Sequence, residues 1–422
     1  MRIAIVIARF PDPTSSFTVT RARALASTGM DIGIFYRNKG NSQFLRTPLF
    51  VSMLESGVRT YRFSSGIGTA HPFFALLRSF TSLRSIQQMF EYIRKALGDG
   101  YSIRNALSLY CSIDQLVRWE PDIVHIDVSY LALGLVGPLA LTKRPIIVSL
   151  RGADVDEKPY LSDRWKQWFR ESGHFENLKF HCVSNYVRSK AINWEVNPSR
   201  SVVIYQGIDP ADFEAVSDSH QDECKHRGLI VVARLSKEKG VDVALKALSL
   251  LPEEDLHLHV IGNGEEMEAL MKLAGNLGIQ ERIFFHGEKS NDWVKTFLVR
   301  NRNKHLYVQP SMYEAFGQAI LEAMAAGIPL IASRIGGVPE LVVEGETGLL
   351  FEMGSAKSLA SRLADLLQNR DLARRLAAQA KIRAMKEFSV AREASQFREL
   401  YLSCLKESGG RITDPSLQTI KM

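Results

Sequence analysis

The stretch VQPSMYEAFGQAILEAMAAGIPLIAS, residues 308–333, contains a strand, a loop, a helix and a second strand. Pro310 ends the first apolar run, and we expect the helix to begin near Gly317. Gly327 should end the helix, because glycine adopts the left-handed conformation that closes helices. Strands and helices alternating in this way are typical of a parallel sheet covered by helices. The stretch therefore predicts an α/β fold.

Two glutamates in this stretch, Glu314 in the loop and Glu322 in the helix, are candidates for ligand contacts. The backbone N–H groups of Phe316, Gly317 and Gln318 would be donors at the start of the helix, which is a ready site for a phosphate. The Glu314 carboxylate could bind sugar hydroxyls, and the Glu322 carboxylate could accept both hydroxyls of a ribose. One element could thus contact a sugar, a diphosphate and a nucleoside.

The same alternation of strands and helices surrounds this stretch on both sides. A polar segment, residues 217–227, is interpreted as a linker, and further apolar runs follow it at 228–235, 256–261 and 282–287. Six runs precede the linker, at residues 2–8, 31–36, 121–127, 145–150, 180–184 and 201–209. The sequence thus predicts two doubly wound α/β domains, the first with six parallel strands. The carboxyl ends of the strands should face a cleft between the domains.

Size and composition agree with two globular domains. The chain has 422 residues, more than one core usually holds, of which 45% are hydrophobic and 23% charged. The four cysteines are isolated, without a CxxC pair, which disfavours a disulfide framework and a zinc site. The apolar run at the N-terminus is too short for a signal peptide or a membrane span, so we expect a cytoplasmic protein.

A second candidate segment is VARLSKEKG, residues 232–240. Arg234 follows a strand, and Lys239 precedes a helix, so these two cations could hold a diphosphate and stabilise its departing charge. Loop cations are also commonly solvated side chains without a ligand. The loop that carries Glu314 favours the ligand role.

Glycine pairs at other strand ends leave a choice open. Gly262 and Gly264 lie in VIGNGEE, and Gly336 and Gly337 lie in SRIGGVPELV. Each pair could admit a ligand close to the backbone, or it could only permit a tight turn.

In the first half, SLRGADVD brings Arg151, Gly152 and Asp154 directly after a strand, at the expected edge of the cleft. These residues could contact a donor or an acceptor, or they could form an ion pair within the loop. His125 lies among apolar residues within a strand. A histidine satisfied in the core is as reasonable there as a catalytic one.

Together these motifs resemble glycosyltransferase family 4, the retaining enzymes of the GT-B fold, in which two Rossmann-like domains face an interdomain cleft. VARLSKEKG resembles the diphosphate-binding Arg and Lys of the family, carried by Arg234 and Lys239. EAFGQAILE resembles its E-x7-E signature, carried by Glu314 and Glu322, which in the family contact the donor hexose and the ribose.

The N-terminal loop FPDPTSSF resembles the variant found in exopolysaccharide and lipopolysaccharide transferases, with Pro11, Ser16 and Phe17 at its positions. One departure is Arg151, since the family commonly has His before the glycine of SLRGADVD. If the His side chain is needed, this departure puts activity in doubt; if mainly the backbone matters, Arg151 could instead contact a charged acceptor.

The resemblance implies four regions: an acceptor-binding domain at 1–210, a nucleotide-sugar-binding domain at 211–388, a helix at 389–406 that crosses back to the first domain, and a flexible tail at 407–422. Gly287 belongs to FFHGEKS, where backbone atoms often contact the base. The implied reaction moves a hexose, with retention, from a nucleotide-diphosphate sugar to a glycan or polyprenyl-diphosphate-linked acceptor in surface polysaccharide biosynthesis. It needs no metal or other cofactor. The alternatives are a sugar-nucleotide epimerase of this fold and a catalytically impaired sugar-nucleotide-binding module.

Positive charge is concentrated in the first half. Residues 1–210 contain 26 Lys and Arg against 17 Asp and Glu, and the remainder contains 27 against 29. Residues 71–97 combine basic residues with an apolar helical stripe, which fits either a core-facing helix or a helix that docks on anionic lipid at the inner face of the plasma membrane. No recognition motif accompanies the charge, so we do not expect nucleic-acid binding.

Overall fold

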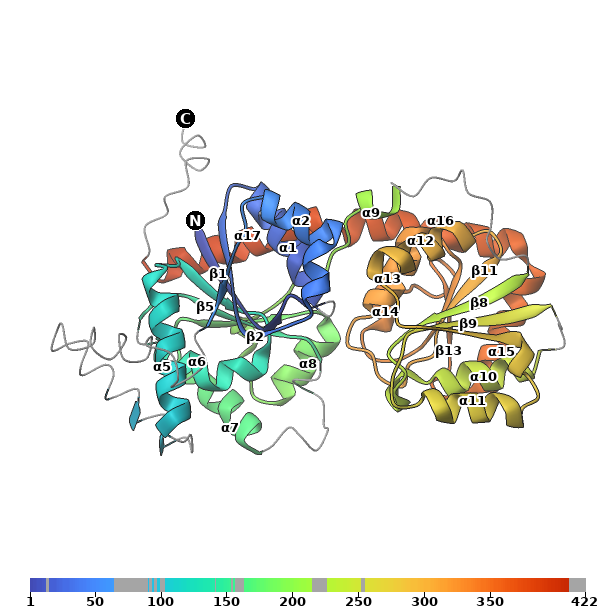
Figure 1. The fold of residues 1–422 in the computed structure, drawn as a ribbon, viewed down its shortest axis with the longest axis horizontal. Coiled ribbons are helices and arrows are strands. Elements are labelled where there is room, and N and C mark those ends of the chain that lie inside the picture. Colours follow the sequence, from blue (N-terminus) through green and yellow to red (C-terminus); the bar gives the residue numbers. More distant parts are fainter. Residues whose placement is uncertain are drawn as a thin grey trace. The chain divides into compact units, whose positions relative to one another are not determined.

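The structure is a computed structural model that describes residues 1–12, 15–63, 90, 93–94, 97–98, 103–140, 142–152, 155, 163–214, 226–251 and 255–409. The chain forms two compact units (Figure 1). Unit 1 consists of Met1–Val183, Arg188–Ile204 and Ala394–Met422, and unit 2 consists of Ser184–Val187 and Tyr205–Glu393. Asp154, most of segment 71–97, most of the linker and the tail from 410 onward lie outside the described residues.

Unit 1 is built on a seven-stranded parallel sheet with the order β3-β2-β1-β4-β5-β6-β7. Its strands are β1 (Arg2–Phe10), β2 (Asp31–Lys39), β3 (Arg59–Arg62), β4 (Ile123–Ile126), β5 (Ile146–Leu150), β6 (Leu178–Cys182) and β7 (Ser201–Val203). The expectation of six strands missed β3. This strand lies at the sheet edge and none of its four residues is buried, so no apolar run marks it.

The helices of unit 1 cover the sheet. Those among the described residues are α1 (Ser16–Ser27), α2 (Pro48–Glu55), α5 (Ile103–Arg118), α6 (Ala132–Ala140), α7 (Asp163–Glu171), α8 (Asn185–Asn193) and, from Ala394 onward, α17 (Val390–Glu407). Phe397 and Tyr401 of α17 are fully buried and belong to the same apolar cluster as Ile3 and Ile5 of β1. The end of the chain thus completes the core that its beginning starts.

Unit 2 contains a six-stranded parallel sheet with the order β10-β9-β8-β11-β12-β13. Its strands are β8 (Arg227–Val232), β9 (Leu256–Ile261), β10 (Ile283–Gly287), β11 (His305–Gln309), β12 (Leu330–Ser333) and β13 (Leu349–Phe351). The strand order reverses between β8 and β11, as it does between β1 and β4 in unit 1, and ligands of doubly wound sheets bind at such switch points. The predicted α/β class with two Rossmann-like domains is confirmed.

Eight helices are described in unit 2, besides the first residues of α8 and α17: α9 (Ala211–Glu214), α10 (Val241–Ser249), α11 (Met267–Asn276), α12 (Asn291–Asn301), α13 (Gln318–Ala326), α14 (Val338–Leu341), α15 (Ala356–Gln368) and α16 (Arg370–Glu387). Helix α13 lies between two left-handed glycines, Gly317 and Gly327, as the sequence predicted. Asn369 caps α16 by accepting a hydrogen bond from the N–H of Leu372.

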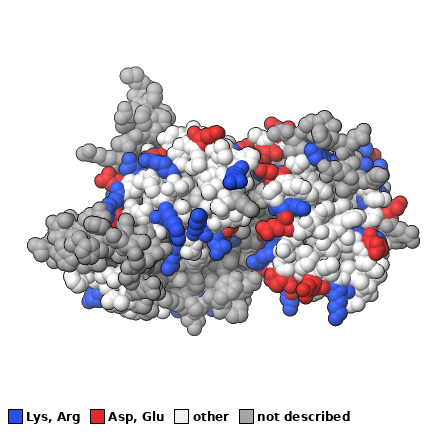
Figure 2. All heavy atoms as spheres, in the orientation of Figure 1, with Lys and Arg blue, Asp and Glu red and all other residues white. Residues whose placement is uncertain are grey.

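Charge is distributed differently over the two units. On the face drawn in Figure 2, the charged side chains described in unit 1 are mostly Lys and Arg, whereas those of unit 2 have both signs. This agrees with the residue counts of the two halves. No helix among the described residues is long and apolar enough to cross a membrane.

Candidate active site

The switch point of unit 2 brings Lys239 and Glu314 together. The loop after β8 carries Lys239, and the loop after β11 carries Glu314. Lys239 Nζ lies 2.9 Å from Glu314 Oε2. The Lys239 side chain is 23% exposed and the Glu314 side chain is 15% exposed. Two residues that sequence reasoning proposed separately therefore form one half-buried ion pair at the carboxyl edge of the sheet.

Close backbone packing holds these two loops against each other. The N–H of Met312 donates to the carbonyl of Glu238 at 2.7 Å. Gly240 has φ +61°, and a Cβ at this position would lie 2.1 Å from the carbonyl oxygen of Pro310. A side chain here would push the loops apart, so the glycine after Lys239 is a requirement of the site geometry.

Gly336 and Gly337 support the same loop from its other side. The N–H of Gly337 donates to the Glu314 carbonyl at 3.0 Å, and a Cβ on Gly336 would lie 2.0 Å from that carbonyl oxygen. This glycine pair thus fixes the backbone of Glu314, which supports the packing alternative.

A chain of buried polar side chains continues from Glu314 into the sheet. Ser311 Oγ donates to Glu314 Oε2 at 3.4 Å, Gln309 Nε2 donates to Ser311 Oγ at 2.8 Å, and the Tyr307 hydroxyl donates to Gln309 Oε1 at 2.6 Å. Burial raises the pKa of Tyr307 well above its usual range, and the charges of Glu322 and Glu314 add to this effect. Tyr307 therefore remains a neutral donor beneath both glutamates.

Arg234 pairs with a different carboxylate, that of Glu238. Its side chain is 67% exposed, and its Nη2 lies 2.5 Å from Glu238 Oε1. An exposed pair of this kind contributes little to stability, so the guanidinium can exchange its partner at small cost.

The start of α13 provides backbone donors next to Glu314. Gly317 has φ +107° and, being glycine, offers no side chain to cap the first turn of the helix. The side chain of Phe316 is buried and stacks on Tyr205 with ring centroids 5.8 Å apart, so only its backbone can serve a ligand. The N–H groups of this turn are the donors that the sequence predicted for an anion, and that role stays a prediction.

Glu322 lies one turn further along α13. Burial raises the pKa of its carboxyl, whereas Lys295 and a hydrogen bond from Gln318 oppose this shift. Lys295 also pairs with Asp212, whose negative charge raises the pKa of Glu322. Its carboxylate is partly buried and remains a candidate acceptor of hydroxyl hydrogen bonds.

The remaining predicted glycines lie at the ends of β9 and β10. A Cβ on Gly262 or Gly264 would lie 1.9 Å or 2.3 Å from the carbonyl oxygens of Ala233 and Leu235. These two residues are therefore required by backbone packing behind Arg234. Gly287 has φ +68°, and a Cβ there would meet no described atom within 4 Å, so space for a ligand remains beside it.

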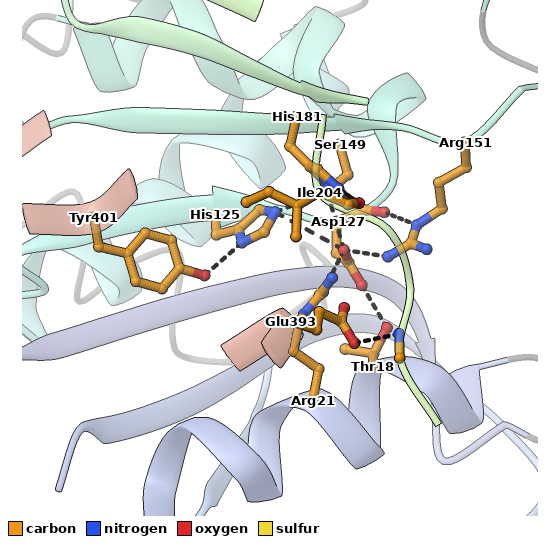
Figure 3. Close-up of polar contacts among 11 residues, drawn as sticks. Thr18, Arg21, His125, Asp127, Ser149, Arg151, His181, Ile204, Glu393 and Tyr401 are labelled. Atoms are coloured by element: carbon orange, nitrogen blue, oxygen red, sulfur yellow. Dashed lines mark hydrogen bonds and ion pairs between the residues drawn. The ribbon is translucent and has the colours of Figure 1, made fainter. Parts of the chain in front are cut away.

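At the switch point of unit 1, four side chains converge on Asp127, which follows β4: Thr18, Arg21, Ser149 and Arg151 (Figure 3). Arg21 Nη2 and Arg151 Nη2 each lie 2.5 Å from Asp127 Oδ1, and the Thr18 hydroxyl donates to Oδ2. Burial disfavours the charged carboxylate, but Arg151 and Arg21 outweigh burial and hold the pKa of Asp127 well below its usual range. Asp127 thus stays ionised in the core.

Arg151 is oriented from two sides. Its Nε donates to the Asp127 carbonyl at 3.0 Å, and its Cζ lies 4.0 Å from the ring centroid of Phe17. The side chain is 18% exposed. The predicted residues Phe17 and Arg151 are therefore in contact, with partly buried Ser16 at the start of α1 and left-handed Gly152 adjoining them in sequence.

His125 lies in a buried hydrogen-bonded chain, which supports its interpretation as a core residue. His181 Nε2 faces the carbonyl of Ile204 at 2.8 Å and must donate, so His181 Nδ1 accepts from Ser149. Ser149 in turn accepts from His125 Nε2, and the Tyr401 hydroxyl donates to His125 Nδ1, both at 2.8 Å (Figure 3). When both histidines are neutral, the single Ser149 proton is shared between His181 Nδ1 at 2.8 Å and Asp127 Oδ1 at 3.2 Å.

The pKa values of both histidines agree with this assignment. Burial lowers the pKa of His125 well below its usual range and lowers the pKa of His181 to about 3.

Sequence reasoning missed Asp127, Arg21 and Ser149. The signal for Asp127 was an acid directly after a buried strand, in DIVHID.

Among the residues that the structure describes, no group of three or more His, Cys, Asp or Glu side chains could hold a metal ion. Three of the four cysteines, Cys111, Cys182 and Cys404, are buried free thiols.

Two family models match the chain, one in each half. The model described as "Glycosyltransferase Family 4" matches residues 15–212, and the model described as "Glycosyl transferases group 1" matches residues 212–383. One relative is N-acetyl-alpha-D-glucosaminyl L-malate synthase from Bacillus anthracis. It is 26% identical over 295 residues, which cover 68% of this chain and 74% of that protein.

Solved structures resemble the whole chain. HepE from Anabaena, in complex with UDP and glucose, has a TM-score of 0.70 at 17% identity and covers 96% of this chain and 100% of its own. WaaG, a glycosyltransferase involved in lipopolysaccharide biosynthesis, has a TM-score of 0.64 at 16% identity and covers 94% of this chain and 99% of its own. The chain therefore belongs to glycosyltransferase family 4 and has the GT-B fold.

Proposed function

We propose that the enzyme transfers a hexose, with retention of anomeric configuration, from a nucleotide-diphosphate sugar to a hydroxyl of a glycan or polyprenyl-diphosphate-linked acceptor in surface polysaccharide biosynthesis. The observation that carries this proposal is the ion pair of Lys239 with Glu314, at 2.9 Å, beside the start of α13. The complex of HepE with UDP-glucose supports the donor class, and the role of WaaG in lipopolysaccharide biosynthesis supports the pathway class.

The residues of unit 2 suit the departure of a diphosphate. Lys239, the N–H groups at the start of α13 and, once it leaves Glu238, Arg234 stabilise the negative charge that develops as the bond from C1 to the phosphate oxygen breaks. The phosphate retains the electron pair of that bond. The acceptor oxygen bonds to C1 on the same face and gives its proton to a phosphate oxygen. These cations take the place of a metal ion, while Glu314 accepts hydrogen bonds from the sugar hydroxyls.

Unit 1 offers a basic position for the acceptor. Asp127 and Phe17 hold the guanidinium of Arg151 in one orientation, yet 18% of this side chain is exposed. An orientated arginine suits bidentate contact with a phosphate, as a polyprenyl diphosphate would present. Arg151 thus takes an acceptor-binding role at the position where the family commonly has His.

Glu314→Ala and Lys239→Ala test the donor site. Each should lower transfer at least about 100-fold, the usual loss for one transition-state contact. Lys237→Ala is the matched control, since Lys237 lies in the same short turn but is exposed. The assay uses nucleotide sugars that raise the melting temperature of the pure protein, with circular dichroism as the folding control. Full transfer by Glu314→Ala would refute the proposed site.

The same assay separates the alternatives. Conversion of the nucleotide sugar without an acceptor would identify an epimerase, and binding without turnover would identify a sugar-nucleotide-binding module. The anomeric coupling constant of the product, measured by NMR, tests retention, and unchanged activity in EDTA is expected. Sedimentation with anionic vesicles tests the proposed peripheral contact with the inner face of the plasma membrane.

A further inference from the structure

Unit 2 contains a basic pocket on the edge of its sheet opposite the candidate active site. The pocket has a volume of about 590 Å³, within the range of small-molecule sites. It lies at the amino ends of β8 and β11 and at the last residues of α13. Lys239 and Glu314 follow the carboxyl ends of the same strands, so the length of β11, roughly 13 Å, separates the two sites.

Six cations line this pocket, and no Asp or Glu is among the described residues that do so. The cations are Arg227, Arg302, Lys304, Arg370, Arg374 and Lys381. They come from three segments of the chain: the start of β8, the turn before β11, and α16. Positive charge from separate elements that converges on one concave surface creates a strong local field for an anion.

Helix α16 gives the pocket its shape. Arg370, Arg374 and Lys381 recur at intervals of four and seven residues and therefore share one helical face. Ala373 and Ala377 lie on this face between them and leave the space that the pocket occupies. The sequence pattern thus combines long cationic side chains with small residues at the positions that would otherwise fill the cavity.

The described contacts of Arg227 and Arg374 bring no carboxylate into the pocket. Arg227 Nη2 donates to the carbonyl of Leu367 at 2.8 Å, which fixes its orientation. Arg374 lies 3.6 Å from Asp371, whose side chain is 95% exposed and is not part of the lining. An exposed pair at this distance is weak, so Arg374 can exchange Asp371 for another anion at small cost.

The floor of the pocket is apolar. Leu306 and Leu366 are buried and line it together with Pro329. An inorganic ion would use only the cationic rim, whereas an organic phosphate could also bury its carbon skeleton against this floor. The planar fork of arginine matches two oxygens of a phosphate, which suits bidentate binding.

We propose that this pocket is a second ligand site of the enzyme, for a phosphate monoester with an organic body, distinct from the donor site. The phosphate would lie between Arg370 and Arg374 of α16, opposite Arg227. This inference does not depend on the proposed transfer reaction, since none of the pocket residues takes part in it.

Binding of inorganic phosphate and of glucose 6-phosphate, measured by isothermal titration calorimetry on the full chain, tests the proposal. Both probes could also occupy the donor site, so every variant is made in a Lys239→Ala background. The double variant Arg370→Ala, Arg374→Ala should weaken binding about tenfold or more, as loss of charged hydrogen bonds does. Arg375→Ala is the matched control, because Arg375 is exposed on α16 outside the lining.

Two outcomes support the proposal and two overturn it. Binding of glucose 6-phosphate that needs Arg370 and Arg374 identifies a soluble phosphate ester. Binding only to phosphatidylglycerol vesicles, through the same two residues, assigns the phosphate to a lipid headgroup. Affinity unchanged in the double variant, or an equal loss in Arg375→Ala, would overturn the site. Alanine favours helix, so α16 should fold in each variant. The double variant Arg370→Ala, Arg374→Ala is also made in the chain that keeps Lys239. Unchanged transfer by that variant separates this test from the test of the active site.

Discussion

Asp127→Asn probes the buried charge cluster of unit 1. Asparagine has the same shape as aspartate, so the change creates no cavity, and the Thr18 hydroxyl can still donate to the amide oxygen. The nitrogens of Arg21 and Arg151 both lie 2.5 Å from one carboxylate oxygen and are therefore at most about 5 Å apart. Without the carboxylate their repulsion is roughly 3 kcal/mol at an effective dielectric constant of about 20. Removal of one partner from a buried pair typically costs about 3–5 kcal/mol, and we expect this loss of unfolding free energy in unit 1.

Asp31→Asn is the matched control for this experiment. Asp31 also lies between two arginines, 3.2 Å from Arg2 and 2.5 Å from Arg59, but these side chains are 36–52% exposed. Water screens such pairs, so the loss should be about 1 kcal/mol or less. Urea unfolding followed by tryptophan fluorescence reports mainly on unit 1, because Trp293 is the one tryptophan that follows residue 204. Equal losses in the two variants would refute the assignment of a buried, charge-dependent cluster.

Other expected outcomes concern pH and backbone geometry. Burial lowers the pKa of His181 to about 3, so between about pH 6.5 and 3 the unfolded chain binds a proton that the folded chain does not. The unfolding free energy of unit 1 should therefore be greatest above about pH 6.5 and fall on acidification. A urea midpoint that stays constant from pH 7.5 to 4.5 would contradict the assignment of both histidines as neutral. Gly240→Ala should reduce both transfer and the stability of unit 2. Its cost should exceed the roughly 1–2 kcal/mol expected for a left-handed residue alone, because of the 2.1 Å approach to Pro310. Gly345→Ala, at φ +72° with no described atom within 4 Å of its Cβ, isolates the backbone cost, and equal effects in the two variants would exclude a role for loop packing.

Local pattern was sufficient for most of the fold. Central parallel strands are buried on both faces, so β1, β5 and β11 appear as continuous apolar runs in the sequence. The edge strand β3 has no buried residue, and β13 has only three residues, so neither carries such a run. Strand order is not written in any local pattern, but right-handed crossovers restrict it to few solutions.

The candidate site was predictable where it consists of contiguous motifs. Glu314, Gly317 and Lys239 each lie in a loop whose type is evident from the sequence, and switch-point geometry brings these loops together. The role of Glu238 as partner of Arg234 was not evident, because loop rotamers decide it. The cluster around Asp127 was missed since its arginines lie 106 residues before and 24 residues after it in the chain.

Net charge was a poor guide to the basic pocket of unit 2. The second half of the chain has 27 basic and 29 acidic residues, so its total charge gives no sign of six cations around one cavity. Sequence counts led us to expect any basic surface in the first half. Only the fold brings Arg227, Arg302 and Arg374 together from across unit 2.

The return of α17 to unit 1 has a consequence for biosynthesis. Phe397 and Tyr401 complete a core whose strands end at Val203, and about 190 residues of unit 2 are made in between. At about 5–20 residues per second, the ribosome needs roughly 10 to 40 s to reach α17. The half of the enzyme that is synthesised first therefore finishes folding last, and its apolar seat for α17 stays uncovered during that interval. A premature stop at residue 394 would leave the residues of unit 2 complete and unit 1 without its last layer.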